Sequence, residues 1–344
     1  MKILAIESSC DETACAIVEN GRHELASTIA SQVDEHKLYG GVVPEIASRR
    51  HIEAISRITQ ETLKKSNLSF KDIDALAVTY APGLIGALLV GVNFVKGLSL
   101  ALNLPIIPVH HLRSHIAANY VTNVNLEPPF LCLIASGGHS HIVEVLDYTK
   151  FNIIGKTRDD AAGEAFDKAA RTMGLSYPGG IEIDKIAKFG DDQFVKLPVP
   201  KINGSDYDFS FSGLKTAIIN QVNSYKMKNN NLTDLSSDKQ ALYNFAASFR
   251  KSVVDILVSK FIKAAEAFNY KKLVLAGGVS ANSLLREELN KECIKRNWEL
   301  FMPQLNLCGD NATMVGAQAY YEYVGNHIGD LSLNAIASLS IEKI

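Results

Sequence analysis

The chain has 344 residues, a length that predicts about two domains. Hydrophobic residues make up 47% of it and charged residues 21%, which excludes the disordered, collagen-like and disulfide-scaffold classes. Lys and Arg total 35 against 37 Asp and Glu, so the formal net charge is −2. Because the chain lacks an overall positive field for nucleic acid, any RNA contact must use a local basic patch or a partner.

The five cysteines are scattered and never spaced as C-x-x-C, which disfavours a disulfide framework or a cysteine zinc site and fits a reducing compartment. The first residues lead into a strand pattern without the features of a signal peptide. The longest apolar stretch, residues 84–104, is interrupted by glycines and by Asn93 and Lys96. We therefore expect a buried core helix there, no membrane span, and a cytoplasmic protein.

The first third of the chain predicts strands that alternate with helices. Two strands joined by a polar turn are expected at 3–7 and 14–18. Hydrophobic periodicity then predicts an amphipathic helix, a strand, the apolar helix and another strand, in that order, at 44–66, 75–79, 84–104 and 106–109.

The strand-turn-strand pattern recurs at 130–146, around Ser136-Gly-Gly-His-Ser140, which indicates two related halves. Alternating strands and helices predict layered α/β domains. We expect the first domain to be residues 1–122, completed by 310–344, and the second to be 123–309. The elements predicted after the repeat are helices at 161–174, 181–189, 239–269, from Ala281 and at 310–323, and strands at 272–276 and 299–302.

His111 and His115 are four residues apart, so on a helix over 112–121 both imidazoles lie on one face, as two ligands of a divalent metal require. Histidines beside a strand end also pack or form hydrogen bonds, and the spacing alone does not choose between these roles. No Glu follows His111, which disfavours H-E-x-x-H protease chemistry. Asp310 is a candidate third ligand, and its alternative role is the N-cap of the last helix.

Two glycine-rich turns follow predicted strands. Ser136-Gly137-Gly138 offers unobstructed backbone N–H groups that suit a phosphate, although a plain hairpin turn is the alternative. Gly277-Gly278 joins a strand to a helix, a setting that suits a nucleotide. Neither is a P-loop or a G-x-G-x-x-G, so Walker ATPases and nicotinamide dehydrogenases lose their usual support.

Ordered motifs along nearly the whole chain resemble the universal tRNA threonylcarbamoyladenosine transferase family, bacterial TsaD type, of the actin/Hsp70/sugar-kinase superfamily. The matching motifs are ESSCDETACAIV (7–18), GGVVPEIASRRH (40–51), APGL (81–84), HHLRSH (110–115), ASGGHS (135–140), DDAAGEAFDKAAR (159–171), YPGG (177–180), DFSFSGLKTA (208–217), GGVSAN (277–282) and DNATM (310–314). The resemblance implies an actin-like α/β fold with two related domains around an interdomain cleft. It also implies transfer of threonylcarbamoyl from threonylcarbamoyl-AMP to N6 of the tRNA adenosine 3′ to the anticodon, in tRNAs that read codons beginning with A.

The same resemblance assigns residues to roles. His111, His115 and Asp310 would bind a divalent metal, with Fe²⁺ favoured over Zn²⁺. A nucleotide ligand, threonylcarbamoyl-AMP or ATP, would contact Ile134, Ala135, Ser136, Gly137, Gly138, Asp167, Gly180, Asp184 and Asn282. The general base stays open between Asp11, Glu12 and His139.

The chain departs from the family pattern at Ser140, Ile181 and Gly309, where Thr, Pro and Thr are more common. Gly309 loosens the backbone beside a presumed metal ligand, which puts metal affinity or selectivity in question. The family precedent implies tRNA as substrate, a TsaB-type actin-like paralogue and a TsaE-type ATPase as partners, and a separate threonylcarbamoyl-AMP synthase. Candidate basic patches for tRNA are Arg49-Arg50, residues 226–228 and Lys271-Lys272.

The sequence leaves two rival functions open. A small-molecule kinase of the same superfamily would use ATP and magnesium and would not need His111 or His115. A nucleotide-regulated scaffold would bind ATP in its cleft and would leave no modified tRNA.

Overall fold

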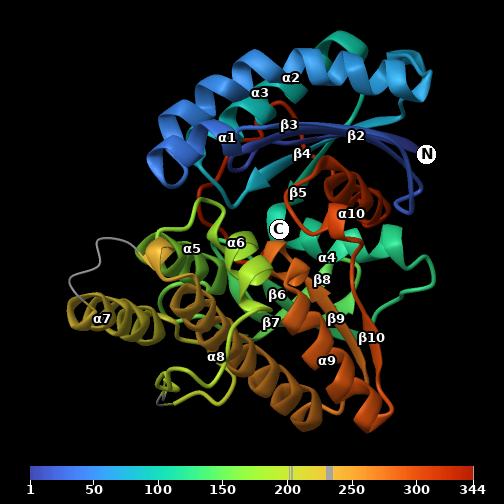
Figure 1. The fold of residues 1–344 in the computed structure, drawn as a ribbon. Helices are drawn as coiled ribbons and strands as arrows, with labels where there is room; N and C mark the ends of the chain where they lie inside the picture. The colour runs from blue at the N-terminus through green and yellow to red at the C-terminus, as the bar shows by residue number, and fades with distance from the viewer. Residues whose placement is uncertain (201, 203, 230–234, 344) are drawn as a thin grey trace. The chain divides into compact units, whose positions relative to one another are not determined.

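The computed structural model describes residues 1–200, 202, 204–229 and 235–343 (Figure 1). The chain divides into two compact units, here called unit 1 (Met1–Phe130, Val145–Asn152 and Phe301–Ile344) and unit 2 (Leu131–Glu144 and Ile153–Leu300). The domain boundaries expected from the sequence, 1–122 with 310–344 and 123–309, stay a prediction.

The sheet of unit 1 has the strand order β3-β2-β1-β4-β5. β1 pairs antiparallel with β2 and parallel with β4, and β4 is parallel to β5. The carboxyl ends of β1, β4 and β5 therefore meet at one edge. The strands are β1 (Lys2–Glu7), β2 (Glu12–Glu19), β3 (His23–Ser31), β4 (Ala75–Ala81) and β5 (Ile106–His110).

Both faces of this sheet are covered, because alternate residues of each strand point to opposite sides. Leu4 and Ile6 of β1 belong to one buried cluster with the helices α2 (Pro44–Ser66) and α3 (Ile85–Leu102). Ile3 and Ala5 belong to a second cluster with α4 (His111–Thr122) and α10 (Ala312–Val324). Unit 1 is thus a helix-sheet-helix sandwich, which explains why β1, β2, β4 and β5 are largely apolar and buried.

Among the described residues, α3 is the one helix long and apolar enough to cross a membrane, judged by length and composition. Leu88, Val92 and Val95 on one face of α3 are buried in the core of unit 1. Only 28% of its residues are buried, and Leu100 on another face is 74% exposed. The helix expected at 84–104 therefore exists but contributes one face to the core, so the expectation of a buried helix is wrong for its other faces.

The second sheet repeats the first. Its order, β10-β9-β6-β7-β8, places a strand-turn-strand unit and a following third strand beside two later strands, as in unit 1. β6 and β9 are parallel, the counterpart of the β1–β4 pair. This identity of strand order confirms the two related halves. The strands are β6 (Phe130–Ala135), β7 (Ser140–Asp147), β8 (Lys150–Lys156), β9 (Lys272–Ala276) and β10 (Glu299–Phe301).

The helices of unit 2 surround the long α8, which contributes Phe245, Phe249 and Phe261 to its buried interior. They are α5 (Ala162–Thr172), α6 (Gly179–Ala187), α7 (Ser212–Lys228), α8 (Lys239–Ala267) and α9 (Ser283–Arg296). The shorter helical segments of the chain are α1 (Val33–His36) and the 3-10 turns Lys37–Tyr39, Phe70–Asp72, Leu235–Ser237, Gly278–Ala281 and Leu305–Leu307.

Candidate metal centre and nucleotide-binding turns

Helix α4 begins where β5 ends, and this junction carries the histidine pair. His110 is the N-cap of α4, and its Nδ1 accepts a hydrogen bond from the backbone N–H of Leu112. His111 and His115 follow on one face, one helical turn apart, with ring centroids separated by 4.7 Å. Both side chains are buried. The helix predicted for this segment therefore places the two imidazoles together, as the i, i+4 spacing requires.

Asp310 lies in the loop before α10, and its Oδ1 is 3.2 Å from His115 Nε2 and 3.6 Å from His111 Nε2. One ligand atom from each of the three residues lies within 4.8 Å of the ligand atoms of the other two. The N-cap of α10 is Asn311, whose side chain accepts from the N–H of Met314. Asp310 is therefore not the helix cap that the sequence left open, and its carboxylate faces the two histidines.

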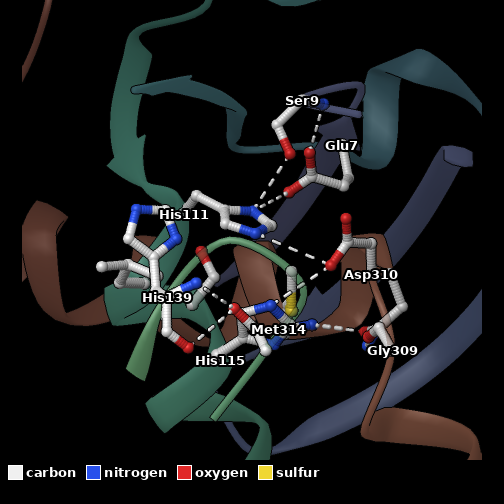
Figure 2. A network of polar contacts seen from close by, with 12 residues as sticks. Glu7, Ser9, His111, His115, His139, Gly309, Asp310 and Met314 are labelled. Carbon is white, nitrogen blue, oxygen red and sulfur yellow. Dashed lines mark hydrogen bonds and ion pairs between the residues drawn. The ribbon is translucent and has the colours of Figure 1, made fainter. Parts of the chain in front are cut away.

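A buried carboxylate behind His111 fixes the orientation of the imidazole (Figure 2). Glu7, at the end of β1, has no exposed surface, and its Oε2 lies 3.2 Å from His111 Nδ1. Ser9 Oγ lies 3.1 Å from the same nitrogen, and Thr79 donates to Glu7 Oε2. A carboxylate only accepts hydrogen bonds, so Glu7 keeps a proton on Nδ1 and directs Nε2 toward Asp310.

Charges around His111 shift the pKa of its imidazole. Burial disfavours the imidazolium of His111, but the charges of Asp310 and Glu7 outweigh burial and raise its pKa to about 9. Burial likewise acts to raise the pKa of Glu7, and the charge and hydrogen bond of His111 reverse that, so the pKa of Glu7 lies below its usual value. The site is thus built to hold positive charge between two carboxylates.

The residues present fit a divalent transition metal. Two imidazoles and one carboxylate form a donor set found in non-haem Fe²⁺ sites and in zinc sites. Neither ring nitrogen of His115 forms a hydrogen bond within the described part of the chain, although both are buried and Nε2 lies 3.2 Å from Asp310 Oδ1. An unpaired buried polar atom is costly, which a metal bond to Nε2 would relieve. Glu7 supplies the outer carboxylate that typically orients a metal-bound histidine.

Asp11 and Glu12, two candidates for the general base, lie at the turn between β1 and β2 in unit 1. Burial and the charge of Asp310 raise the pKa of Asp11. Burial, with the charges of Asp11 and Asp310, raises the pKa of Glu12 to about 8. Glu12 Oε1 accepts from Ser31 Oγ at 2.8 Å, and its Oε2 is buried with no hydrogen-bond partner among the residues that the structure describes. Both acids therefore sense the charge of the candidate metal site.

The turn after β6 belongs to unit 2 and is closed by its own backbone. The N–H of Ser136 donates to the carbonyl of His139 at 2.8 Å, and the N–H of His139 donates to Ser136 Oγ at 3.2 Å. A side-chain carbon added at Gly137 or Gly138 would meet open space. Ile134 and Ala135, which precede the turn, are buried in β6. The turn therefore exposes backbone at two glycines, as the phosphate-binding prediction requires.

The second glycine turn is packed against the first. Gly277 has a φ of +88°, and a Cβ there would lie 2.5 Å from the carbonyl oxygen of Ala135. A Cβ at Gly163, at the start of α5, would lie 2.6 Å from the carbonyl oxygen of Ser136. Only glycine permits these approaches. The carboxyl ends of β6 and β9 and the start of α5 are thus joined at one place in unit 2.

The other predicted ligand-binding residues of unit 2 form two pairs. Asp167 Oδ1 accepts the N–H of Gly179 at 2.7 Å, which ties α5 to the start of α6 beside Gly180. Asp184 Oδ2 accepts the N–H of Ser283, and Asn282 caps α9 by accepting the N–H of Leu285. The structure therefore gathers Asp167 with Gly180, and Asp184 with Asn282.

Several residues at these sites were missed by the sequence analysis. Glu7 was assigned to a strand only, although a carboxylate ending an apolar strand signals a buried partner. Arg250 of α8 donates to Asp184 Oδ1 at 3.0 Å. Lys215 pairs with Asp160, and Ser210 with Asp159, which joins the DFSFSGLKTA and DDAAGEAFDKAAR motifs. For Arg250 and Lys215 the sequence carries no local signal, because the carboxylate that each one contacts lies more than fifty residues away in the chain.

Solved structures with this fold are distant in sequence. HypF from T. kodakarensis superposes with a TM-score of 0.61 at 14% identity, over 96% of this chain and 49% of that chain. Component A of the (R)-2-hydroxyglutaryl-CoA dehydratase of Acidaminococcus fermentans gives 0.53 at 15% identity, over 94% of this chain and 99% of that chain. These likenesses show that the chain shares its α/β fold with both proteins over nearly its whole length, which confirms the predicted α/β fold class.

Relatives close in sequence carry a specific activity in their names. A tRNA N6-adenosine threonylcarbamoyltransferase of Clostridium botulinum (strain Kyoto / Type A2) is 50% identical over 341 residues, 99% of this chain and 98% of the relative. One of Clostridium perfringens (strain 13 / Type A) is 50% identical over 339 residues, 98% of each chain. The TsaD pattern itself, described as tRNA N6-adenosine threonylcarbamoyltransferase, matches residues 23–317. The chain therefore belongs to the TsaD family of tRNA N6-adenosine threonylcarbamoyltransferases.

Proposed function

We propose that this transferase is metal-dependent, and that it moves the threonylcarbamoyl group from threonylcarbamoyl-AMP to N6 of the tRNA adenosine 3′ to the anticodon, in tRNAs that read codons beginning with A. Transferase activity on tRNA follows from the family. The observation that carries the metal-dependent part is the meeting of His111, His115 and Asp310, with ligand atoms within 4.8 Å, in front of the buried Glu7.

His111, His115 and Asp310 are the proposed ligands, with Fe²⁺ favoured and Zn²⁺ as the alternative. When bound, such a cation supplies Lewis-acid stabilisation of negative charge on oxygen. Glu7 and Ser9 hold the ring of His111 through Nδ1. Because these partners are buried, they fix the ligand before any metal arrives, which lowers the reorganisation needed for binding.

The proposed nucleotide site uses backbone and side chains of unit 2. The segment Ile134, Ala135, Ser136, Gly137 and Gly138 would bind the phosphate of the adenylate, or of ATP, through N–H groups. Support comes from the open space beside both glycines and from the parallel strands whose carboxyl ends meet there. Asp167, Gly180, Asp184 and Asn282 would contact the ribose and adenine.

The acceptor amine is a weak nucleophile, because its lone pair is delocalised into the adenine ring. Positioning and stabilisation of charge on the leaving oxygen must then supply most of the rate. Asp11, Glu12 and His139 are the proposed general bases. Glu12 has the best-supported case, because a pKa of about 8 lies close to the pH at which a base is most effective.

A TsaB-type actin-like paralogue, a TsaE-type ATPase and a separate threonylcarbamoyl-AMP synthase are the proposed partners. The near-neutral net charge supports a need for partners in holding tRNA. Of the predicted basic patches, Arg49 pairs with Glu45, and Arg50 with Glu35 and Glu53, so this patch offers less free positive charge than its sequence suggests. A cytoplasmic location is proposed from the free thiols of all five cysteines, each of which lies in the described part of the chain.

Reconstitution tests the proposal. Purified full-length protein, Fe²⁺ or Zn²⁺, the proposed partners, threonylcarbamoyl-AMP and cognate tRNA are combined, and the tRNA is digested for nucleoside mass spectrometry. N6-threonylcarbamoyladenosine is expected with wild type and not with His115→Ala. Product formed equally well after chelation of the metal would contradict metal dependence, and phosphorylation of a small molecule without a tRNA product would favour a kinase.

A further inference from the structure

Arg113 lies between the two histidines of α4 in sequence and on the opposite side of the helix, two residues from each. Its side chain is only 3% exposed. A buried guanidinium is costly unless its donors are paired. Arg113 has no place in the metal site itself, so its partners show what it does.

The partners of Arg113 come from two directions. Its Nη1 donates to Glu322 Oε1 of α10 at 3.0 Å. Its Nε and Nη2 donate to the carbonyl of Ile341 at 3.0 and 2.7 Å, and Nη2 also donates to the carbonyl of Lys343 at 3.0 Å. The guanidinium lies over the ring of Phe151, 4.7 Å from its centroid. One side chain therefore joins α4 to α10 and to the last described segment of the chain.

The Glu322 end of this link is itself held in place. Its side chain is 2% exposed, and it accepts from Gln318 Nε2 at 2.8 Å and lies 2.6 Å from His327 Nδ1. Helix α10 begins two residues after Asp310. The Arg113–Glu322 ion pair thus ties the helix with the two histidines to the helix that follows the third proposed ligand.

The tail segment, here residues 336–343, runs beside the same elements. The N–H of Ile336 donates to the carbonyl of Tyr80, and the N–H of Gly83 donates to the carbonyl of Ala337. His110 Nε2 lies 3.2 Å from the carbonyl of Leu339. The tail therefore bonds to α4 at His110, immediately before His111, and at Arg113, immediately before the turn that carries His115.

We propose that Arg113 is a positioning residue for the metal ligands, and that the tail segment is the strap that holds it, so that tail order and metal affinity are coupled. This inference rests on the proposed metal site. Without the tail, Arg113 loses its carbonyl acceptors and keeps Glu322 as the acceptor for a buried guanidinium with several N–H donors, which favours movement of α4. Loss of the outer-sphere partners that orient metal ligands typically lowers metal affinity by about 10- to 100-fold. A small movement of the two histidines should have an effect of that order.

Metal binding by the purified full-length chain tests the coupling, with Zn²⁺ as the probe in competition with a chromophoric chelator. Arg113→Lys keeps the positive charge near Glu322. It loses the planar guanidinium group whose N–H donors reach the carbonyls of Ile341 and Lys343. A second variant ends at Ser338. It removes the tail carbonyls that His110 and Arg113 contact and leaves the sequence of α4 intact. The matched control is Leu257→Ala, at a fully buried residue of α8 in unit 2, which lowers stability outside the unit that contains the tail and the proposed ligands.

We expect Arg113→Lys and the chain that ends at Ser338 each to bind Zn²⁺ about 10-fold more weakly or worse, while Leu257→Ala binds like wild type below its melting temperature. Because coupling is reciprocal, Zn²⁺ should also slow amide hydrogen exchange in residues 336–343 of wild type. Affinities within twofold of wild type, with no metal-dependent protection of the tail, would overturn the coupling. If His111→Ala binds Zn²⁺ as well as wild type, the proposed metal site itself fails, and the coupling with it.

Discussion

The candidate metal centre of unit 1 and the glycine turns of unit 2 are built in opposite ways. In the metal centre, side chains from three separate segments converge, and Glu7 holds one of them from behind. In the turns, the side chains are missing, and Gly163 and Gly277 let backbones approach where no Cβ fits. The metal centre therefore depends on the charge and donor type of its side chains, whereas the glycine turns depend on empty space and backbone geometry.

The largest effect is expected from removing a proposed ligand. His115→Ala and Asp310→Ala each leave the donor set incomplete, and Lewis-acid stabilisation is worth several kcal/mol, which corresponds to losses of roughly 100-fold or more in turnover. Metal content after dialysis and nucleoside mass spectrometry of tRNA measure the two consequences. Full metal content in either variant would break the side-chain account of this site.

A smaller effect is expected from Glu7→Gln, which keeps the shape of the side chain and removes its charge. The variant should bind Zn²⁺ about 10- to 100-fold more weakly, because the outer carboxylate sets the orientation and basicity of His111. Chelator competition measures this. Thr79→Val is the control, since it removes one donor to Glu7 and leaves the carboxylate in place. Equal affinities for Glu7→Gln and wild type would show that Glu7 only fills space.

The glycine turns are tested by a matched pair of substitutions. Gly277→Ala puts a Cβ against Ala135 at a φ of +88°, whereas a Cβ at the neighbouring Gly278 meets open space. We expect Gly277→Ala to lower the free energy of unfolding by about 1–3 kcal/mol and to weaken adenylate binding, with Gly278→Ala near wild type in stability. Urea unfolding and binding isotherms measure both. Similar losses in the two variants would contradict the packing argument.

The smallest effect concerns Glu12. Its pKa of about 8 in the fold exceeds the ordinary value of 4.5, so between these pH values the unfolded chain binds fewer protons than the folded one. Glu12 therefore destabilises the protein increasingly as the pH rises through that window. Glu12→Gln removes this penalty. The melting temperature of the variant should exceed that of wild type by roughly 2–4 °C at the upper pH of the window, and by less at the lower pH. A gain that is the same at both ends would rule out titration of Glu12.

Local patterns predicted most of the architecture. The amphipathic helix at 44–66 matches α2, and the strand at 272–276 matches β9. β3 (His23–Ser31) was missed because exposed polar residues interrupt its pattern, so no apolar run or strict alternation marks it. β8 (Lys150–Lys156) was missed for the same reason.

The candidate sites divide along similar lines. The spacing of His111 and His115 predicts their shared face, because helix geometry is local. Joining Asp310 to them needs the fold to close across almost two hundred residues, so the residues alone leave Asp310 open between a third ligand and a helix cap, and the family resemblance assigns it as a ligand. Glu7, Arg113 and Arg250 have roles set by partners distant in the chain, and no local pattern shows such partners.

We propose that this chain modifies tRNA with His111, His115 and Asp310 as metal ligands. The most direct measurement is the amount of N6-threonylcarbamoyladenosine in total tRNA after depletion of the protein, with complementation by wild type and by an alanine variant at each ligand. We expect the nucleoside to disappear on depletion and wild type alone to restore it. Persistence of the nucleoside without the protein, or restoration by any of the three variants, would contradict it.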